Sequence, residues 1–199
     1  MRDFNHPSVF GKGCFGIGIY KASHHNTQTK EYNIWIKMLE RCYSTEYQNK
    51  YPSYIGCIVS EEWLNFQVFA QWYHENKVEK YQLDKDILVK GNKIYSPLTC
   101  CFVPQEINLL FTKKNTNRGI FPIGVNSYKY KETPERYRAT LSRNGRIVTL
   151  GRYNTIEEAF QIYKQAKEQY IKQIADKYKS TISQHCYEAM YKYIVEITD

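Results

Sequence analysis

The stretch R-Y-R-A-T-L-S-R-N-G-R-I-V-T-L-G-R-Y, residues 136–153, decides how the C-terminal half of this chain folds. Two alternating runs, 136–143 and 146–153, are joined by Asn144-Gly145, the pair best suited to a two-residue type I′ turn. The stretch therefore predicts a β-hairpin. Because side chains alternate along a strand, one face is mainly apolar: Tyr137, Ala139, Leu141, Val148 and Leu150. The opposite face carries Arg138, Thr140, Ser142, Ile147 and Thr149.

The residues after the hairpin predict a long helix, from about Thr155 to Tyr178. Thr155 can cap it, and Glu157 and Glu158 lie in the first turn, where carboxylates suit the positive end of the helix dipole. Apolar residues recur at helical spacing along it: Ala159, Ile162, Tyr163, Ala166, Tyr170, Ile171 and Ile174. With a further strand before the hairpin, the sequence predicts a three-stranded antiparallel sheet backed by one long helix. The uncovered sheet face would then carry polar side chains, including Asn126 and Tyr128, with Arg143, Arg146 and Arg152 at its edges.

Positive charge is concentrated in this region. From Lys113 to Arg152 there are ten basic and two acidic residues, and their net charge of +8 equals that of the whole 199-residue chain. The remainder is therefore neutral. Clustered positive charge beside polar and aromatic side chains indicates binding to a phosphate backbone, whereas the alternative is a basic surface that serves solubility alone.

Several linked motifs resemble a known family. G-V-x-x-Y at 124–128, Y-R-A-T-L at 137–141, V-T-L-G-R-Y at 148–153 and N-T-I-E-E-A-F-Q-I-Y at 154–163 are similar to the plant ethylene-response-factor (AP-two) DNA-binding domain. In that family the sheet lies in the major groove of double-stranded DNA and strand residues read bases. Asn126 and Tyr128 stand where the family often has arginines, and Thr149 replaces a tryptophan. The resemblance therefore implies the family's fold, but not recognition of the DNA sequence that the plant proteins bind.

The resemblance implies a set of DNA contacts. Arginines and lysines would lie on phosphates, and polar strand residues would lie nearest the bases. The candidates are Asn126, Tyr128, Lys129, Arg138, Thr140, Ser142, Arg143, Arg146, Thr149 and Arg152.

The N-terminal half predicts a helical module of α+β character. Residues 1–31 form a leader with a short strand at 15–20, followed by helices at 32–43 and, capped by Ser60, at 61–76. Six cysteines without C-x-x-C spacing favour a reducing cytoplasm and argue against a cysteine zinc site. No apolar run is long enough to span a membrane, and the N-terminus lacks a signal-peptide core.

Residues 81–110 predict a ββα unit. A strand at 83–88, a turn at 90–92, a short return at Ile94-Tyr95 and a closing segment at 97–108 resemble an HNH nuclease core, which many phage proteins pair with an AP-two domain. By position Asp84 and Asn108 match the family's metal ligands, Lys85 replaces its histidine base, and Asn92 or Ser96 could occupy an intermediate polar position. The resemblance implies Mg²⁺ or another divalent ion, as in homing endonucleases.

The missing histidine leaves alternatives open. A protonated lysine cannot accept a proton at neutral pH unless burial lowers its pKa strongly. Lys85 could instead contact phosphate while Asp86 or a metal-bound water acts as the base. Equally, Asp84, Lys85, Asp86 and Asn92 could fix a tight hairpin. The three functions that follow are a metal-dependent DNA endonuclease, a non-catalytic DNA-binding regulator, and a protein-interaction module that inhibits a host defence.

The predicted domain organisation follows from these patterns. An HNH-like module at 32–111 and an AP-two-like domain at 119–178 are joined by a basic linker at 112–118. Residues 179–199 are expected to add a C-terminal helix, with its apolar stripe between Ile182 and Ile197, and the sequence leaves the oligomeric state open.

Overall fold

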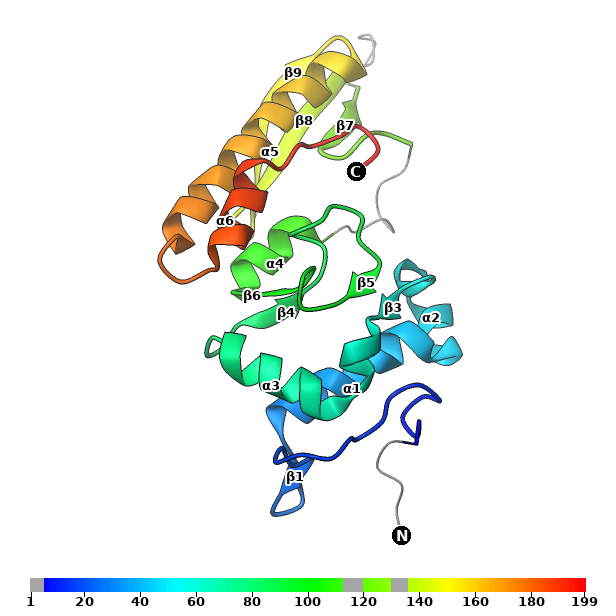
Figure 1. Ribbon diagram of the computed structural model, residues 1–199. Coiled ribbons are helices and arrows are strands. Elements are labelled where there is room, and N and C mark those ends of the chain that lie inside the picture. The colour runs from blue at the N-terminus through cyan, green and yellow to red at the C-terminus, as the bar shows by residue number, and fades with distance from the viewer. Residues whose placement is uncertain (1–5, 113–119, 130–135) are drawn as a thin grey trace. The chain divides into compact units, whose positions relative to one another are not determined.

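The computed structural model describes residues 6–112, 120–129 and 136–199 (Figure 1). The chain divides into two compact units. One is formed by Met1–Asn108 with Thr181–Cys186, and the other by Leu109–Ser180 with Tyr187–Asp199. The predicted linker at 112–118 lies outside the described residues except for Thr112. The fold is α+β, as the sequence predicted.

Helix α1, Lys30–Tyr43, confirms the first predicted helix. Thr29 caps it by accepting a hydrogen bond from the Tyr32 amide. Its inner side buries Trp35, and the indole Nε1 of Trp35 donates to the Trp63 carbonyl at 2.8 Å. This indole therefore fills the core while its one polar atom is satisfied. Two short helical segments follow: α2 (Thr45–Lys50) and the 3₁₀ helix η1 (Pro52–Tyr54).

The second predicted helix is divided in the structure. Residues Glu61–Leu64 form the 3₁₀ helix η2, and α3 spans Phe66–Asn76. Asn65 lies between them in an extended conformation, and its side chain accepts from the Gln67 amide, so Asn65 caps α3 in place of Ser60. The aromatic side of this segment is core, as predicted, with Trp63, Phe66 and Phe69 fully buried.

The leader contains no strand at 15–20. Gly16 has a left-handed φ of 72°, which interrupts an extended run there. The segment is held instead by Gln67, whose side-chain amide donates to the Tyr20 carbonyl and accepts from the Tyr20 amide, both at 2.9 Å. The strands of the leader, β1 (Ser23–His24) and β2 (Thr27–Gln28), form a small antiparallel hairpin.

A ββα unit forms, but its second strand is β6 (Cys101–Val103), which lies within the closing segment expected at 97–108, and not the predicted return strand at Ile94–Tyr95. Strand β4, Gln82–Asp84, pairs antiparallel with β6, and α4 follows at Gln105–Phe111. The predicted partner, β5 (Ile94–Tyr95), pairs in parallel with β3 (Ile58–Val59). The expected strand at 83–88 therefore ends at Asp84, and residues 85–93 form a loop.

The C-terminal unit confirms the predicted sheet and helix. Strands β7 (Val125–Tyr128), β8 (Arg136–Arg143) and β9 (Arg146–Tyr153) form an antiparallel sheet in that order. Asn144 and Gly145 have φ values of 50° and 73°, as a type I′ turn requires. Helix α5, Ile156–Tyr178, starts with a capping box between Thr155 and Glu158 and lies along one side of the sheet (Figure 1).

The final helix is shorter than predicted. Helix α6 spans Gln184–Tyr191, and the chain beyond it is not helical. That last segment is held against α5 through the backbone of Val195: its carbonyl accepts from Lys164 Nζ at 2.6 Å, and its amide donates to Glu168 Oε1 at 2.9 Å. The side chain of Val195, which belongs to the predicted apolar stripe, is buried there although its segment is not helical.

A half-buried lysine gives the C-terminal unit a testable pH dependence. Lys167 Nζ donates to the Leu110 carbonyl at 2.8 Å, and burial lowers the pKa of Lys167 to about 8 from 10.5. Between these two values the unfolded chain holds a proton that the native state has lost, so stability rises with pH. Relative to Lys167→Met, the unfolding free energy of the wild type should rise by about 1–3 kcal/mol across this window.

Urea unfolding at about pH 7.5 and about pH 10 measures this difference. Lys172 lies exposed on the same helix, so Lys172→Met serves as the matched control and should show no such change. A difference between wild type and Lys167→Met that stays constant with pH would contradict the prediction.

Candidate nucleic-acid interface

The sheet of the C-terminal unit has one face packed and one face open. On the packed face, Val125 lies opposite Ala139, and both are buried together with Tyr163 of α5. On the open face, Asn126 lies opposite Arg138, and the Asn126 side-chain amide donates to Thr140 Oγ1 at 3.1 Å. Alternation along β8 thus separates a hydrophobic core from a row of hydrogen-bonding side chains.

A β-bulge decides which face Arg152 occupies. The register pairs Thr140 with Thr149 but Ala139 with Gly151, so Leu150 is the additional residue in β9. Beyond the bulge the alternation shifts by one residue, and Arg152 lies opposite Arg138 on the open face. The sequence placed Arg152 at an edge, whereas the structure brings it into the polar row.

Arg152 is held in place by an aromatic ring. Its guanidinium carbon lies 4.5 Å from the centroid of the Tyr128 ring, which belongs to β7 on the far side of β8. Because the guanidinium nitrogens of a stacked arginine remain able to donate at their edges, this arrangement orients Arg152 without using its hydrogen bonds. The open face therefore presents two arginines, Arg138 and Arg152, among neutral donors and acceptors.

The predicted contact residues divide between the two faces. Six of the predicted residues join Arg152 in register on the open face: Asn126, Tyr128, Arg138, Thr140, Ser142 and Thr149. Arg143 and Arg146 lie opposite each other on the face of the sheet that packs against α5. Lys129 is exposed just beyond β7. The Arg143 guanidinium lies 5.2 Å from the Tyr170 ring centroid, so this arginine packs on α5.

Arg136 is a further basic residue of the open face that was not among the predicted contacts. Arg136 lies opposite Tyr128 and is exposed. Strict alternation from Arg138 would have identified it, since residues two apart along a strand share a face.

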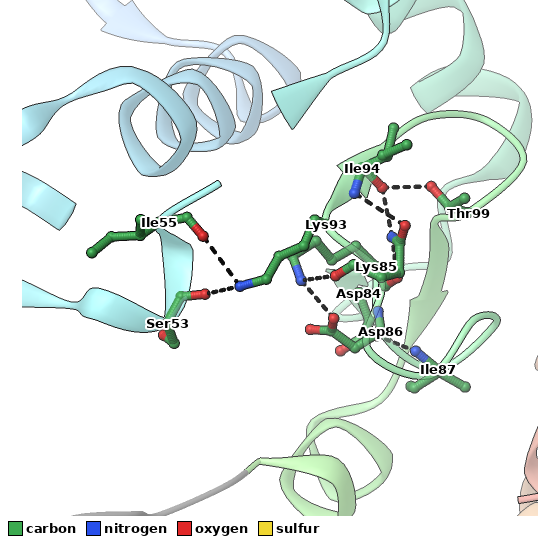
Figure 2. A network of polar contacts seen from close by, with 10 residues as sticks. Ser53, Ile55, Asp84, Lys85, Asp86, Ile87, Lys93, Ile94 and Thr99 are labelled. Atoms are coloured by element: carbon green, nitrogen blue, oxygen red, sulfur yellow. Dashed lines mark hydrogen bonds and ion pairs between the residues drawn. The ribbon is translucent and has the colours of Figure 1, made fainter. Parts of the chain in front are cut away.

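Four of the five HNH-like candidates form a compact polar network after β4: Asp84, Lys85, Asp86 and Asn92 (Figure 2). Asp84 is buried, and its Oδ1 accepts from the Asp86 amide at 2.8 Å and the Ile87 amide at 3.0 Å. Burial, the largest cause, raises the pKa of Asp84, while these two amide hydrogen bonds oppose the change. This carboxylate therefore closes the turn that follows β4.

Lys85 and Asn92 complete the loop. Lys85 is buried, and its ammonium donates to Asp86 Oδ1 at 2.5 Å and to the Asn92 carbonyl at 2.9 Å. The Asn92 side-chain amide donates to the carbonyls of Lys85 and Ile94, at 2.7 and 2.6 Å. These bonds join the start of the loop to its end, although the loop is not the tight hairpin that the alternative role for these residues assumed.

The two metal-ligand candidates have separate partners. Asn108 Nδ2 donates to Gln82 Oε1 at 2.7 Å, at the end of β4 remote from the turn that Asp84 closes. Among the described residues, no group of three or more His, Cys, Asp or Glu side chains could hold a metal ion. The six cysteines are all free thiols, five of them buried.

Comparisons with family models, with curated proteins and with solved structures found no match for this chain. Within the part of the chain that the structure describes, no helix is both long enough and apolar enough to cross a membrane.

Proposed function

We propose that this protein binds double-stranded DNA by placing the open face of the β7-β8-β9 sheet in the major groove. The observation that carries the proposal is the open face itself, where a half-buried Arg138, an exposed Arg152 and a row of hydrogen-bonding side chains lie on the side of the sheet opposite α5. Packing of the sheet does not require two adjacent arginines on its open face, whereas base edges and phosphates are suitable partners for both.

Size and charge support the same partner. Three strands at about 4.8 Å spacing span roughly 10 Å, and the major groove is about 12 Å wide. The region from Lys113 to Arg152 carries the whole net charge of the chain. Exposed basic residues near the sheet, such as Lys129 and Arg146, would contact phosphates, while Asn126, Arg138 and Thr140 would lie nearest the bases.

Binding of mixed-sequence duplex DNA, followed by fluorescence anisotropy at several salt concentrations, tests the proposal. Wild-type affinity should fall steeply with added salt, and Arg138→Ala should weaken it by about 10- to 100-fold, the value of one bidentate arginine contact. Lys172→Ala removes the same charge from the exposed side of α5 and should bind as the wild type does. Equal effects of the two substitutions would contradict docking through the sheet.

For the ββα unit we propose a scaffold role. The side chains of Asp84, Lys85 and Asn92 are hydrogen-bonded within their own loop, which supports stabilisation of the unit in preference to metal-dependent hydrolysis. The endonuclease hypothesis remains the second candidate, because β4 and β6 form an antiparallel pair that α4 follows, although β6 takes the place of the predicted return strand β5.

A further inference from the structure

An isoleucine lies on the polar face, on the edge strand β9 near the hairpin turn. Ile147 lies opposite Ser142 in the β8-β9 pairing and is 78% exposed. Its neighbours in register on that face are Thr140, Ser142 and Thr149, all of which carry hydroxyl groups. The next residue, Val148, lies opposite Leu141 on the other face. Ile147 is thus separated from the hydrophobic core by the full thickness of the sheet.

The structure holds this side chain in a defined position. Ile147 follows the Asn144-Gly145 turn by two residues, and Asn144 Oδ1 accepts from the Tyr170 hydroxyl of α5 at 3.1 Å. Arg143 packs on the same tyrosine ring. Both anchors keep the tip of the hairpin against the helix. A β-branched side chain also has few rotamers, so Ile147 is presented to solvent as a rigid apolar group.

A single exposed isoleucine needs no explanation by itself. Here its surroundings suggest a ligand, since every other described side chain on this face suits hydrogen bonds, charge or stacking. In the major groove the base edges offer donors, acceptors and one apolar group, the C5-methyl of thymine. 5-Methylcytosine carries the same methyl group at the same ring position.

We propose that Ile147 determines sequence specificity by contacting the C5-methyl group of a pyrimidine in the major groove. The inference rests on the proposed binding of DNA by the open face. Ser142 and Thr149 flank the isoleucine and can donate hydrogen bonds to, or accept them from, adjacent base edges. The methyl contact would therefore lie between base contacts made by these two side chains. No other open-face residue combines high exposure with a purely apolar side chain among the residues described.

The test uses the full chain and duplexes selected by it from a randomised pool. Each thymine of a selected site is replaced in turn by uracil, which removes only the methyl group. At one position or more, uracil should weaken wild-type binding about fourfold, the value of burying one methyl group. Ile147→Ser should bind the thymine and uracil duplexes equally at that position, and Ile147→Val should retain the discrimination.

A parallel series replaces each cytosine by 5-methylcytosine and separates the two sources of the methyl group. A gain of affinity that Ile147→Ser loses supports the inference with 5-methylcytosine as the ligand. If uracil and 5-methylcytosine change nothing at any position, or change Ile147→Ser as much as wild type, the inference is overturned while DNA binding stands. Failure to bind any duplex overturns the proposed function and the inference with it.

Discussion

Replacing Gly124 with alanine should destabilise the C-terminal unit by about 3 kcal/mol or more. Gly124 precedes β7 with a φ of 78°, where an L side chain is strained, and a Cβ there would overlap the buried ring of Tyr163. The Gly124 carbonyl also accepts from the Thr140 amide at 2.8 Å, which joins β7 to β8. Neither the ring nor the strand can move without opening the core beneath the open face.

Gly145 provides a control that separates overlap from backbone strain. It has a φ of 73°, close to that of Gly124, but a Cβ there would meet nothing within 4 Å. Gly145→Ala should therefore cost only about 1–2 kcal/mol, the left-handed penalty. Thermal unfolding followed by the far-UV signal of the helices measures both variants, with roughly 4–8 °C expected per kcal/mol in a unit of this size. Equal losses would show that the Tyr163 contact contributes little.

Local patterns predicted the C-terminal unit well because its determinants are close in sequence. Asn144-Gly145 specifies the turn, alternation specifies the two faces, and Thr155 with Glu158 specifies the start of α5. The bulge at Leu150 could not be predicted in this way, since it is defined by the pairing of β9 with β8. The position of Arg152 on the open face depends on that one unpaired residue.

The N-terminal unit was harder to predict because its pairings join distant residues. Residues 83–88 read as a strand, yet the side chain of Asp84 accepts two amides of the following turn and ends the strand there. The partner of β4 comes from Cys101–Val103, after a loop that the hairpin pattern did not anticipate. For the candidate site, residue types indicated a polar cluster, but the partners of each side chain could be assigned only from the structure, because bonds such as that between Lys85 and Asn92 join residues seven positions apart.

Asp84→Ala should lower the unfolding free energy of the N-terminal unit by about 2–4 kcal/mol, because it leaves the Asp86 and Ile87 amides without their acceptor. All three tryptophans of the chain lie in this unit, so their fluorescence during urea unfolding reports the loss. Asp84→Asn keeps an oxygen at the accepting position and should remain within about 1 kcal/mol of wild type. A small effect of the alanine substitution would contradict a loop-fixing role for Asp84.

The asparagine variant also has a pH signature. Burial raises the pKa of Asp84 above its usual value of 3.8, so as pH rises this carboxyl loses its proton in the unfolded chain before it does in the native state. The free energy of unfolding therefore falls with pH until the native carboxyl has ionised as well. Wild type should therefore lose stability relative to Asp84→Asn as pH increases from about 4, and an unchanged difference would argue against a buried carboxylate.

Asp84→Asn also distinguishes the two proposed roles of the ββα unit, scaffold and nuclease. It preserves the turn but removes the carboxylate that a divalent ion would need. On supercoiled plasmid with Mg²⁺ or Mn²⁺, we expect wild type and Asp84→Asn to retard the DNA equally and to leave it supercoiled. Nicked or linear product from wild type that disappears with Asp84→Asn would establish an HNH-like endonuclease. In that case the loop that holds Asp84, Lys85 and Asn92 together would have to open for metal and phosphate to enter, and Asp86, which is the most exposed carboxylate of the network, would become the first candidate for the base.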